Sequence, residues 1–313
     1  MEQPRYLLHE QIDKKKWDDR IATAANGLVY ACSGYLDAMA GQWDALVLND
    51  YEIVMPLTSR KKMGIRYLFQ PSITPALGVF GDNISVAMIR DFLNAIPRKF
   101  KVQDISFNSS NQLSGNRGTI IPRSNYILAL SGEYAFVQQG YSENIQRNIT
   151  RAVKAGCTVS KDVSFEQVAT ICKKEFPKFT TVENGLFEKL EMVYDTFRQQ
   201  SETYGVYSKE GMLLASCIFL FFKNRAYYWL VGNAVESKQF GASSLLVDSF
   251  IKDHAGKDLV LDFEGSDTPS VADFYKKFGS TPEPYSSLYI NDLPFPISLL
   301  KPLPEYYRRL ISK

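Results

Sequence analysis

A tyrosine and a glutamate in the C-terminal part of the chain could transfer protons. Tyr275 lies within residues 272–279, and Glu264 directly follows the apolar run Leu259–Phe263. A carboxylate at a strand end can be partly desolvated, which raises its pKa and suits a general base. A tyrosine hydroxyl held near a reacting group can act as a general acid. Each residue also has a structural interpretation, because Tyr275 shares a helix face with apolar residues and strand-end carboxylates often cap loops.

A glycine-containing loop upstream has the composition of an anion-binding turn. Gly241 precedes a helical pattern, and a residue without a side chain at the mouth of a helix lets a phosphate approach the backbone N–H groups. Lys238 adds a positive charge to the same loop. The candidate phosphate-binding residues are Lys238, Gln239, Phe240, Gly241, Ala242 and Ser243. A G-x-S turn is common, so its position before a long helix is what supports this interpretation.

A second group of cations lies on a predicted helix near the middle of the chain. Arg147, Arg151 and Lys154 recur at i, i+4 and i+7, which places them on one stripe of that helix. The predicted apolar face of the helix consists of Ile145, Ile149, Ala152 and Val153. Because arginine can bind phosphate or carboxylate oxygens through two parallel hydrogen bonds, Arg147 and Arg151 are candidate substrate-binding residues. The alternative is a solvated charged face, which is the commoner role of such a stripe.

The elements that must position these groups follow from the pattern of residues 238–279. Apolar residues at i, i+3, i+4 and i+8 predict a helix directly after Gly241. Leu259–Phe263 predicts a buried strand. An N-cap followed by proline, Thr268-Pro269, predicts the start of a second helix, which ends at Gly279. The predicted order is therefore turn, helix, strand and short helix.

This order, with two motifs in it, resembles the cofactor half of the Gcn5-related N-acyltransferase (GNAT) fold. Residues 238–243 lie where that superfamily has Q/R-x-x-G-x-G/A, the loop around the pyrophosphate of coenzyme A. Lys238 and Ser243 depart from that pattern. Residues 272–279 (ADFYKKFG) look like the signature A-x-x-F-Y-x-x-x-G. The resemblance implies acyl-coenzyme A as co-substrate and Tyr275 as the acid that protonates the leaving thiolate.

The same stretch also resembles the Fem family of peptidoglycan aminoacyltransferases. Residues 262–265 (DFEG) fit the strand motif DF-x-G, and residues 274–279 fit F-K-x-x-F-G with Tyr275 in place of lysine. Residues 141–156 look like the Fem pattern R-x-I-R-K-A-x-K-x-G. The family implies aminoacyl-tRNA as donor, whereas the tyrosine and the phosphate-loop-like turn favour coenzyme A. At motif level the resemblance covers about residues 141–160 and 238–279.

The chain also reads as a duplication. Two hairpin strands, a cationic turn, a third strand, a helix and a further strand occur in both halves, with Arg60–Lys62 and Lys223–Arg225 as the predicted turns. The last strands of the two copies also correspond. We therefore predict an α/β fold of the α+β type with two tandem GNAT-like domains, each a mixed central sheet flanked by helices.

The two predicted domains are not equivalent. Domain 1–135 lacks the phosphate loop and the tyrosine, which predicts a degenerate copy that serves as scaffold or acceptor side. Domain 136–313 is the predicted catalytic copy, with the boundary near residues 132–141. A C-terminal helix over residues 302–311 is predicted to dock back on the first domain, as Fem-like proteins do with a terminal segment.

The composition is that of a soluble globular protein in a reducing compartment. The 313 residues are 45% hydrophobic and 22% charged, which suits two domains, and the net charge of +2 predicts no strongly basic surface. The longest apolar run, Met212–Phe222, is too short to span a bilayer as a helix. Four cysteines lack C-x-x-C spacing and two histidines cannot build an ordinary zinc site, so we predict reduced thiols, a cytoplasmic location and no metal.

Together these features predict an enzyme that transfers an acyl group from acyl-coenzyme A to an amine acceptor. No motif in the sequence identifies that acceptor. One alternative is a Fem-like aminoacyltransferase that uses aminoacyl-tRNA on a cell-wall precursor. For tRNA, the segments Arg60–Lys62, Lys173–Lys174 and Lys276–Lys277 would supply a basic track, although such lysines more often serve solubility. Another alternative is a duplicate without catalysis that binds a ligand. The oligomeric state does not follow from the sequence.

Overall fold

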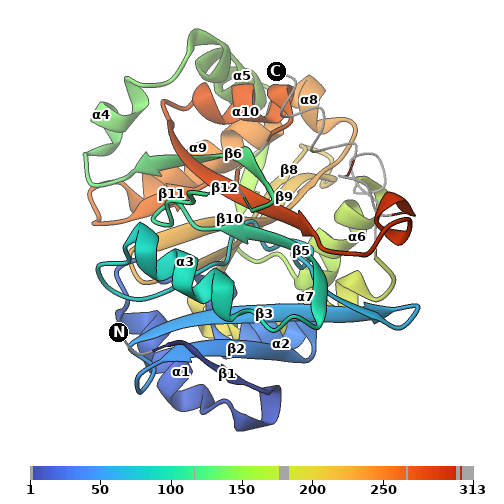
Figure 1. The fold of residues 1–313 in the computed structure, drawn as a ribbon. Helices are drawn as coiled ribbons and strands as arrows, with labels where there is room; N and C mark the ends of the chain where they lie inside the picture. Colours follow the sequence, from blue (N-terminus) through green and yellow to red (C-terminus); the bar gives the residue numbers. More distant parts are fainter. Residues whose placement is uncertain (1–2, 116, 176–182, 266, 301–303, 305–313) are drawn as a thin grey trace. The chain divides into compact units, whose positions relative to one another are not determined.

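The computed structural model describes the chain except for residues 1–2, 116, 176–182, 266, 301–303 and 305–313 (Figure 1). The chain divides into two compact units, one formed by Met1–Ser124 with Pro284–Lys313 and the other by Asn125–Glu283. We call them unit 1 and unit 2. The predicted helix over residues 302–311 lies outside the described residues. Mixed sheets flanked by helices confirm the predicted fold class.

Unit 1 contains a run of strands in the order β1-β2-β3-β4-β5-β12. Their bounds are Arg5–Leu7 (β1), Trp43–Leu48 (β2), Ile53–Lys62 (β3), Ile65–Leu68 (β4), Phe100–Phe107 (β5) and Thr281–Asn291 (β12). The pairing of β4 with β5 is parallel. The pairings of β1 with β2, β2 with β3, β3 with β4 and β5 with β12 are antiparallel. Side chains alternate between the two faces of a strand, so each face of this sheet needs its own covering layer.

The helices of unit 1 cover both faces of its sheet. They are α1 (Lys14–Thr23), α2 (Ser33–Ala40) and α3 (Val86–Ala95). Trp43 of β2 packs on Trp17 of α1 with ring centroids 4.7 Å apart. Leu46, three positions later and on the other face, belongs to a buried cluster with Phe92 of α3. The helix α3 is capped by Ser85, whose hydroxyl accepts a hydrogen bond from the Met88 N–H in its first turn.

Unit 2 contains the strand order β6-β11-β10-β9-β8-β7. The bounds are Thr119–Ala129 (β6), Thr158–Ser160 (β7), Ser201–Tyr207 (β8), Leu213–Phe222 (β9), Arg225–Asn233 (β10) and Val260–Asp262 (β11). β10 pairs with β11 in parallel, and the other pairings are antiparallel. The strand predicted at residues 259–263 is therefore confirmed as β11.

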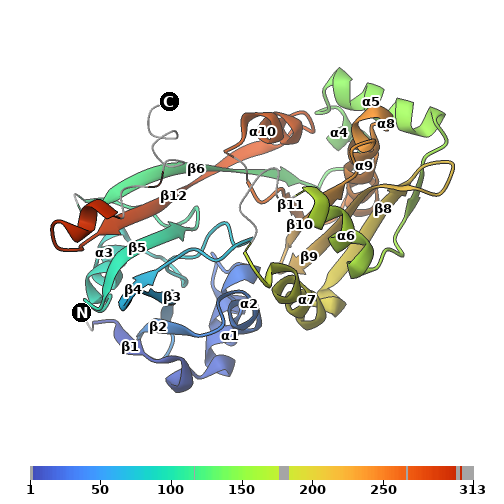
Figure 2. The ribbon, with the colours of Figure 1, turned by 90° about the vertical axis from the view of Figure 1, so that its right-hand side faces the viewer.

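Helices also cover both faces of the unit 2 sheet (Figure 2). Their bounds are Tyr134–Gln138 (α4), Glu143–Lys154 (α5), Phe165–Glu175 (α6), Leu186–Thr196 (α7), Ser237–Phe240 (α8), Ala242–His254 (α9) and Pro269–Lys276 (α10). Phe219 of β9 stacks on Phe250 of α9, with ring centroids 3.7 Å apart. Gly232 of β10, on the opposite face, lies against Ile171 of α6.

The two units repeat one pattern of strand pairing, with an exchange of the last strand. In unit 1, β3 and β4 pair antiparallel and β4 and β5 pair parallel; β9, β10 and β11 do the same in unit 2. β6 follows the first copy in the sequence, yet it pairs with β11. β12 follows the second copy and pairs with β5. Each copy is therefore completed by the strand that follows the other copy in the sequence.

Both predicted turns are wrong in detail, because Arg225, predicted in the second turn, begins β10. Arg60–Lys62 belongs to β3 rather than to the connection, which consists of Met63 and Gly64 alone. Both of these residues have positive φ, 49° for Met63 and 80° for Gly64. Because a two-residue turn with such dihedrals already closes a hairpin, the strand continues to Lys62.

Candidate functional site

The predicted phosphate-binding residues lie where one helix ends and the next begins, with Lys238, Gln239 and Phe240 in α8 and Ala242 and Ser243 in the first turn of α9 rather than in a loop. The helix α8 ends at Gly241, whose φ of 79° is left-handed, and α9 begins at Ala242. The side chains of Lys238 and Gln239 are exposed, and that of Phe240 is half-buried. The Ser243 hydroxyl donates to the side-chain oxygen of Asn233 over 2.6 Å. The Ser243 hydroxyl is thus held by the protein, and Lys238 is the charged residue among these six.

Gly241 is needed where it stands because another helix passes close to it. A Cβ atom on Gly241 would lie 2.4 Å from the backbone oxygen of Asn148 in α5. The space that a side chain would take is therefore filled by the backbone of α5. This packing accounts for the glycine without a ligand, and its role in binding a phosphate stays a prediction.

We expect Gly241→Ala to destabilise the protein more than the same change at Gly256, beyond the C-terminal end of α9. Both glycines have φ near 80°, but a Cβ on Gly256 would meet nothing within 4 Å. Gly256→Ala therefore carries only the cost of the left-handed backbone, about 1 kcal/mol net. Gly241→Ala also forces α5 to move, which adds roughly 1–3 kcal/mol. Urea unfolding of both variants measures the difference, and equal losses would show that α5 tolerates the methyl group.

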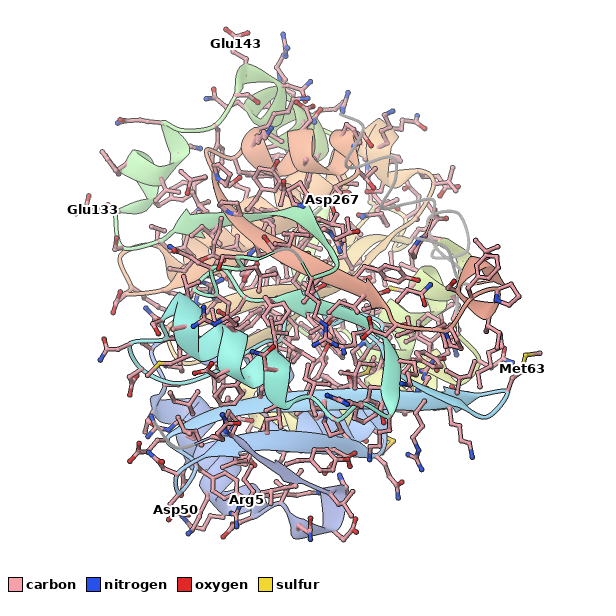
Figure 3. All side chains as sticks on the ribbon, in the orientation of Figure 1. Arg5, Asp50, Met63, Glu133, Glu143 and Asp267 are labelled. Atoms are coloured by element: carbon pink, nitrogen blue, oxygen red, sulfur yellow. The ribbon has the colours of Figure 1, made fainter. Side chains whose placement is uncertain are left out.

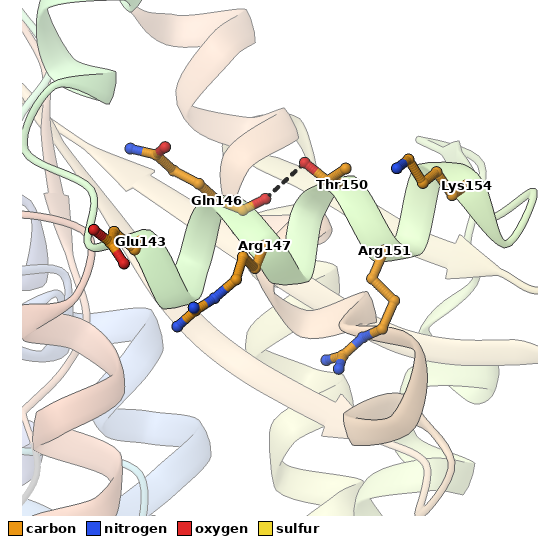
Figure 4. Close-up of a pocket in the computed structure, with 6 residues that line it drawn as sticks. All are labelled: Glu143, Gln146, Arg147, Thr150, Arg151 and Lys154. Atoms are coloured by element: carbon orange, nitrogen blue, oxygen red, sulfur yellow. Dashed lines mark hydrogen bonds between the residues drawn. The ribbon is translucent and has the colours of Figure 1, made fainter.

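The cationic residues of α5 line a shallow groove of about 560 Å³ together with Glu143, Gln146 and Thr150 (Figure 4). Arg147 and Arg151 extend to the same side of the helix, whereas Lys154 extends away from them (Figure 4). One guanidinium nitrogen of Arg151 donates to the Asn148 side-chain oxygen at 2.7 Å and to the Lys238 carbonyl at 3.3 Å. Arg151 therefore ties α5 to α8, which contains the first three candidate phosphate-binding residues.

Arg147 is the exposed arginine next to this contact. Among the described residues, no carboxylate lies within ion-pair distance of its guanidinium. The buried face of α5 consists of Ile145 and Ala152, with Ile149 partly buried. The prediction that Val153 shares that face is wrong, because 59% of Val153 is exposed. The structure thus brings Arg147, Arg151 and Lys238 to one side of unit 2.

Tyr275 and Glu264 lie at the end of β11. The ring of Tyr275, in α10, stacks on Phe263 with a centroid distance of 4.6 Å. Tyr275 is 9% exposed, and its hydroxyl makes no hydrogen bond to any residue in the described part of the chain. Burial, and then the negative charge of Glu264, raise the pKa of Tyr275. The hydroxyl therefore keeps its proton at neutral pH, as a proton donor must.

Regular strand pairing ends next to these two residues. β10 pairs with β11 only from Arg225 to Tyr227, and a bulge interrupts the pairing of β10 with β9 between Tyr228 and Leu230. A bulge re-aims side chains and ends regular pairing, and bulges are frequent beside active sites. The Tyr228 ring lies 6.4 Å from that of Tyr275, at nearly a right angle. Tyr275 thus lies next to the point where the pairing of β10 with β11 ends.

A buried ionic cluster that sequence analysis missed fixes the end of β11. Arg225 donates to Asp262 over 2.6 Å and to both carboxylate oxygens of Glu283, over 3.0 and 2.9 Å. The other oxygen of Asp262 accepts the Glu264 N–H at 2.8 Å. Burial raises the pKa of Asp262, which the positive charge of Arg225 opposes. The cluster positions Glu264, whose φ of 60° is left-handed.

The sequence signal for Arg225 and Asp262 is that each is a charged residue at one end of an apolar strand, Arg225 at the start of β10 and Asp262 at the end of β11. Arg225 and Asp262 are 37 residues apart, and Arg225 and Glu283 are 58 residues apart. Nothing in the sequence pairs them. The last glycine of the 272–279 signature has a packing reason as well, because a Cβ on Gly279 would lie 3.1 Å from the backbone of Gly140.

The chain has a FemX-like fold, which is built as two GNAT-like halves. FemX is similar with a TM-score of 0.65 over 95% of this chain and 99% of its own, at 12% identity. L-PGS from Bacillus licheniformis is similar with a TM-score of 0.54 over 96% of this chain and 98% of its own, at 12% identity. A conserved protein of unknown function from Bacteroides thetaiotaomicron VPI-5482 gives a TM-score of 0.61 at 9% identity, over 88% of this chain and 96% of its own.

No family model and no curated protein matches the sequence. The structural likeness therefore establishes the architecture, which confirms the predicted resemblance at the level of the fold. Within the described ranges, no helix is long and apolar enough to cross a membrane. All four cysteines are free thiols.

Proposed function

We propose that the protein is a cytoplasmic N-acyltransferase that moves an acyl group from acyl-coenzyme A to an amine, with its reaction centre in unit 2. The observation that carries the proposal is the grouping of Arg147, Arg151 and Lys238 beside the start of α9. Three cations near the positive end of a helix dipole suit a pyrophosphate. In this proposal the tyrosine and glutamate at the end of β11 serve the acyl group.

The fit to coenzyme A rests on charge rather than on a glycine cradle. α5 occupies the space next to Gly241, so that glycine is already explained by packing. Arg147 is exposed and carries no ion pair among the described residues, so it can bind a phosphate without first breaking one. Lys238 is exposed on the adjacent helix α8. These two residues are the proposed phosphate ligands, and Arg151 holds their helices together.

The proposed reaction needs one base and one acid. The amine nitrogen attacks the thioester carbon, a C–N bond forms, the C–S bond breaks, and the sulfur leaves as a thiolate. Glu264 takes the proton that the amine loses, directly or through water, and the Tyr275 hydroxyl gives a proton to the thiolate. Burial of Tyr275 raises its pKa, which keeps this proton in place until the sulfur leaves.

The second candidate donor is aminoacyl-tRNA, which the resemblance of residues 262–265 and 274–279 to Fem motifs implies. The basic track required for tRNA gains little support from local contacts. Lys276 lies over the ring of Tyr126, and Lys277 pairs with Asp273 at 2.6 Å. These lysines are therefore engaged within α10 and its neighbourhood. We favour coenzyme A as donor.

Calorimetric titration with acetyl-coenzyme A, and turnover with a panel of amines, test the proposal. Arg147→Gln is expected to weaken binding roughly tenfold to hundredfold, because a charged hydrogen bond contributes about 1.5–3 kcal/mol. Arg90→Gln, which changes an exposed arginine on α3 in unit 1, is the control and should leave binding unchanged.

Three outcomes are decisive. Binding without turnover on any amine would favour a ligand-binding duplicate. No binding of acyl-coenzyme A, with a salt-sensitive gel shift of aminoacyl-tRNA, would favour the Fem-like donor, because released counterions make RNA binding fall steeply with salt. Equal affinity of the wild type and Arg147→Gln would remove the arginine from the site.

A further inference from the structure

The hairpin formed by β3 and β4 in unit 1 ends in an exposed apolar residue between cations. Met63 is 93% exposed, and Lys61, Lys62 and Gly64 beside it are exposed as well. Figure 3 shows the Met63 side chain projecting from the tip of the hairpin. The segment 59–69 (SRKKMGIRYLF) contains four cations and no acidic residue. Met63 is the most exposed large apolar residue in the described part of the chain.

Met63 does not stabilise the turn in which it lies. Met63 and Gly64 connect two paired strands, and both have positive φ, the condition of a type I′ turn. Asparagine, aspartate and glycine are favoured at the first of these positions, because a longer side chain is strained there. A methionine at 93% exposure also gains almost nothing from burial. The hairpin would therefore be more stable in the variant Met63→Asn.

Two opposed positive charges do not stabilise the hairpin either. Lys61 is directly opposite Arg66 across the two strands. Like charges at directly opposed positions destabilise a strand pair. Neither side chain has an ion pair with any residue of the described ranges. The tip thus has two features that destabilise it, Met63 in the turn and the opposed cations. Such features indicate that the segment contacts a partner outside the chain.

The chemistry of the tip identifies the kind of surface that it fits. Cations occupy both faces of the hairpin, with Lys61 and Arg66 on one and Lys62 on the other. Such an arrangement attracts phosphates from either side, and the apolar tip requires a layer without water in front of it. A nucleic acid would satisfy the lysines but offers no apolar layer to Met63. An anionic bilayer offers both, phosphates at its surface and acyl chains beneath them.

We propose that the β3–β4 hairpin docks the protein on anionic lipid bilayers. Met63 enters the boundary between head groups and acyl chains, while Lys61, Lys62 and Arg66 meet lipid phosphates. This inference is independent of the proposed acyl transfer, because its residues lie in unit 1. The contact is weak and reversible, since it consists of a few charges and one side chain.

Co-sedimentation with vesicles of phosphatidylcholine and phosphatidylglycerol in equal parts tests the docking. A basic residue near an anionic surface contributes about 1 kcal/mol, which is roughly fivefold in the partition coefficient. Lys61→Glu should lower partitioning by at least that factor, and Met63→Asn roughly fivefold or more. Moderate salt should weaken the binding, and vesicles of phosphatidylcholine alone should bind little.

Both variants are expected to fold at least as well as the wild type, which separates binding from stability. Met63→Asn places a favoured residue in the turn, and Lys61→Glu faces Arg66 with an opposite charge. Their unfolding midpoints should therefore stay equal or rise. Met192→Asn and Lys209→Glu, at exposed positions of unit 2, are the matched controls and should leave partitioning unchanged.

Several outcomes would overturn the proposal. One is the absence of wild-type binding to the mixed vesicles at low salt. Another is binding that Met63→Asn leaves unchanged. A third is a single-stranded RNA oligomer that binds more tightly than the vesicles and depends on Lys61 but not on Met63, which would assign the hairpin to nucleic acid instead.

Discussion

Tyr275→Phe is expected to lower acyl transfer roughly 10²–10⁴-fold while the protein stays folded, because a positioned proton donor contributes that much to the rate. The change removes one hydroxyl and keeps the ring that stacks on Phe263. The hydroxyl makes no hydrogen bond to the described residues, so its removal strands no partner. The free energy of unfolding should therefore change by less than about 1 kcal/mol.

The measurement pairs turnover with urea unfolding on the wild type and the variant. Tyr141→Phe is a matched control, because the ring of Tyr141 packs against Phe278 of the segment that follows α10. Removal of that hydroxyl should leave the rate unchanged. A normal rate in Tyr275→Phe would instead make Tyr275 a core residue.

The pH dependence gives a second test of Tyr275. Its folded pKa is raised above the ordinary value of tyrosine. The hydroxyl therefore keeps its proton at the pH values at which an ordinary tyrosine loses its own. Ionisation of Tyr275 should not lower the rate of acyl transfer in that pH range. The stability that Tyr275 contributes is present below its unfolded pKa and is lost only as the pH rises toward and through its folded pKa.

Arg225→Met is expected to destabilise the protein by about 3–5 kcal/mol, because it leaves buried carboxylates without their cation. The Asp262 side chain is 4% exposed, and Arg225 and Glu283 are 21% exposed each. Glu264 also loses an anchor, since its N–H donates to Asp262. Urea unfolding measures the loss. Arg117→Met, which breaks the exposed pair with Asp292, should cost only about 0–1 kcal/mol.

The deficit of Arg225→Met should shrink as the pH falls from neutral. Burial already raises the pKa of Asp262 in the folded protein, and loss of the cation must raise it further. A group with a raised folded pKa stabilises the fold below its unfolded pKa, and that contribution is lost as the pH rises through the folded value. Protonation at mildly acidic pH thus removes the unpaired charge. A deficit that is independent of pH would show that Asp262 is not the stranded group.

Sequence patterns predicted the local elements around the candidate site well. The helix after Gly241, the strand at residues 259–263 and the helix that begins at Pro269 are all present. Apolar periodicity and capping residues report on a single segment and need no information from elsewhere in the chain. The order of these elements carried the resemblance to the acyltransferase fold.

Contacts between distant segments could not be predicted in the same way. Periodicity shows that one face of a helix is buried but not which element covers it. The sequence around Gly241 suggests a phosphate-binding turn, whereas the structure places the Asn148 backbone against this glycine. Arg225 was assigned to a cationic turn, whereas it begins β10 and pairs with two carboxylates. The exchange of β6 and β12 is likewise a matter of pairing, which no single strand specifies.

The exchange of these two strands has a consequence for how the chain is made. β5 cannot pair with β12 until residues 281–291 have been synthesised, and unit 2 is synthesised in between. β11, in contrast, finds its partner β6 already made. The second unit to be translated can therefore close first, and the first to be translated closes last. The duplicated stretch of sequence and the compact folding unit thus have different boundaries. Cutting the gene between the two copies would separate β6 from β11 and β12 from β5.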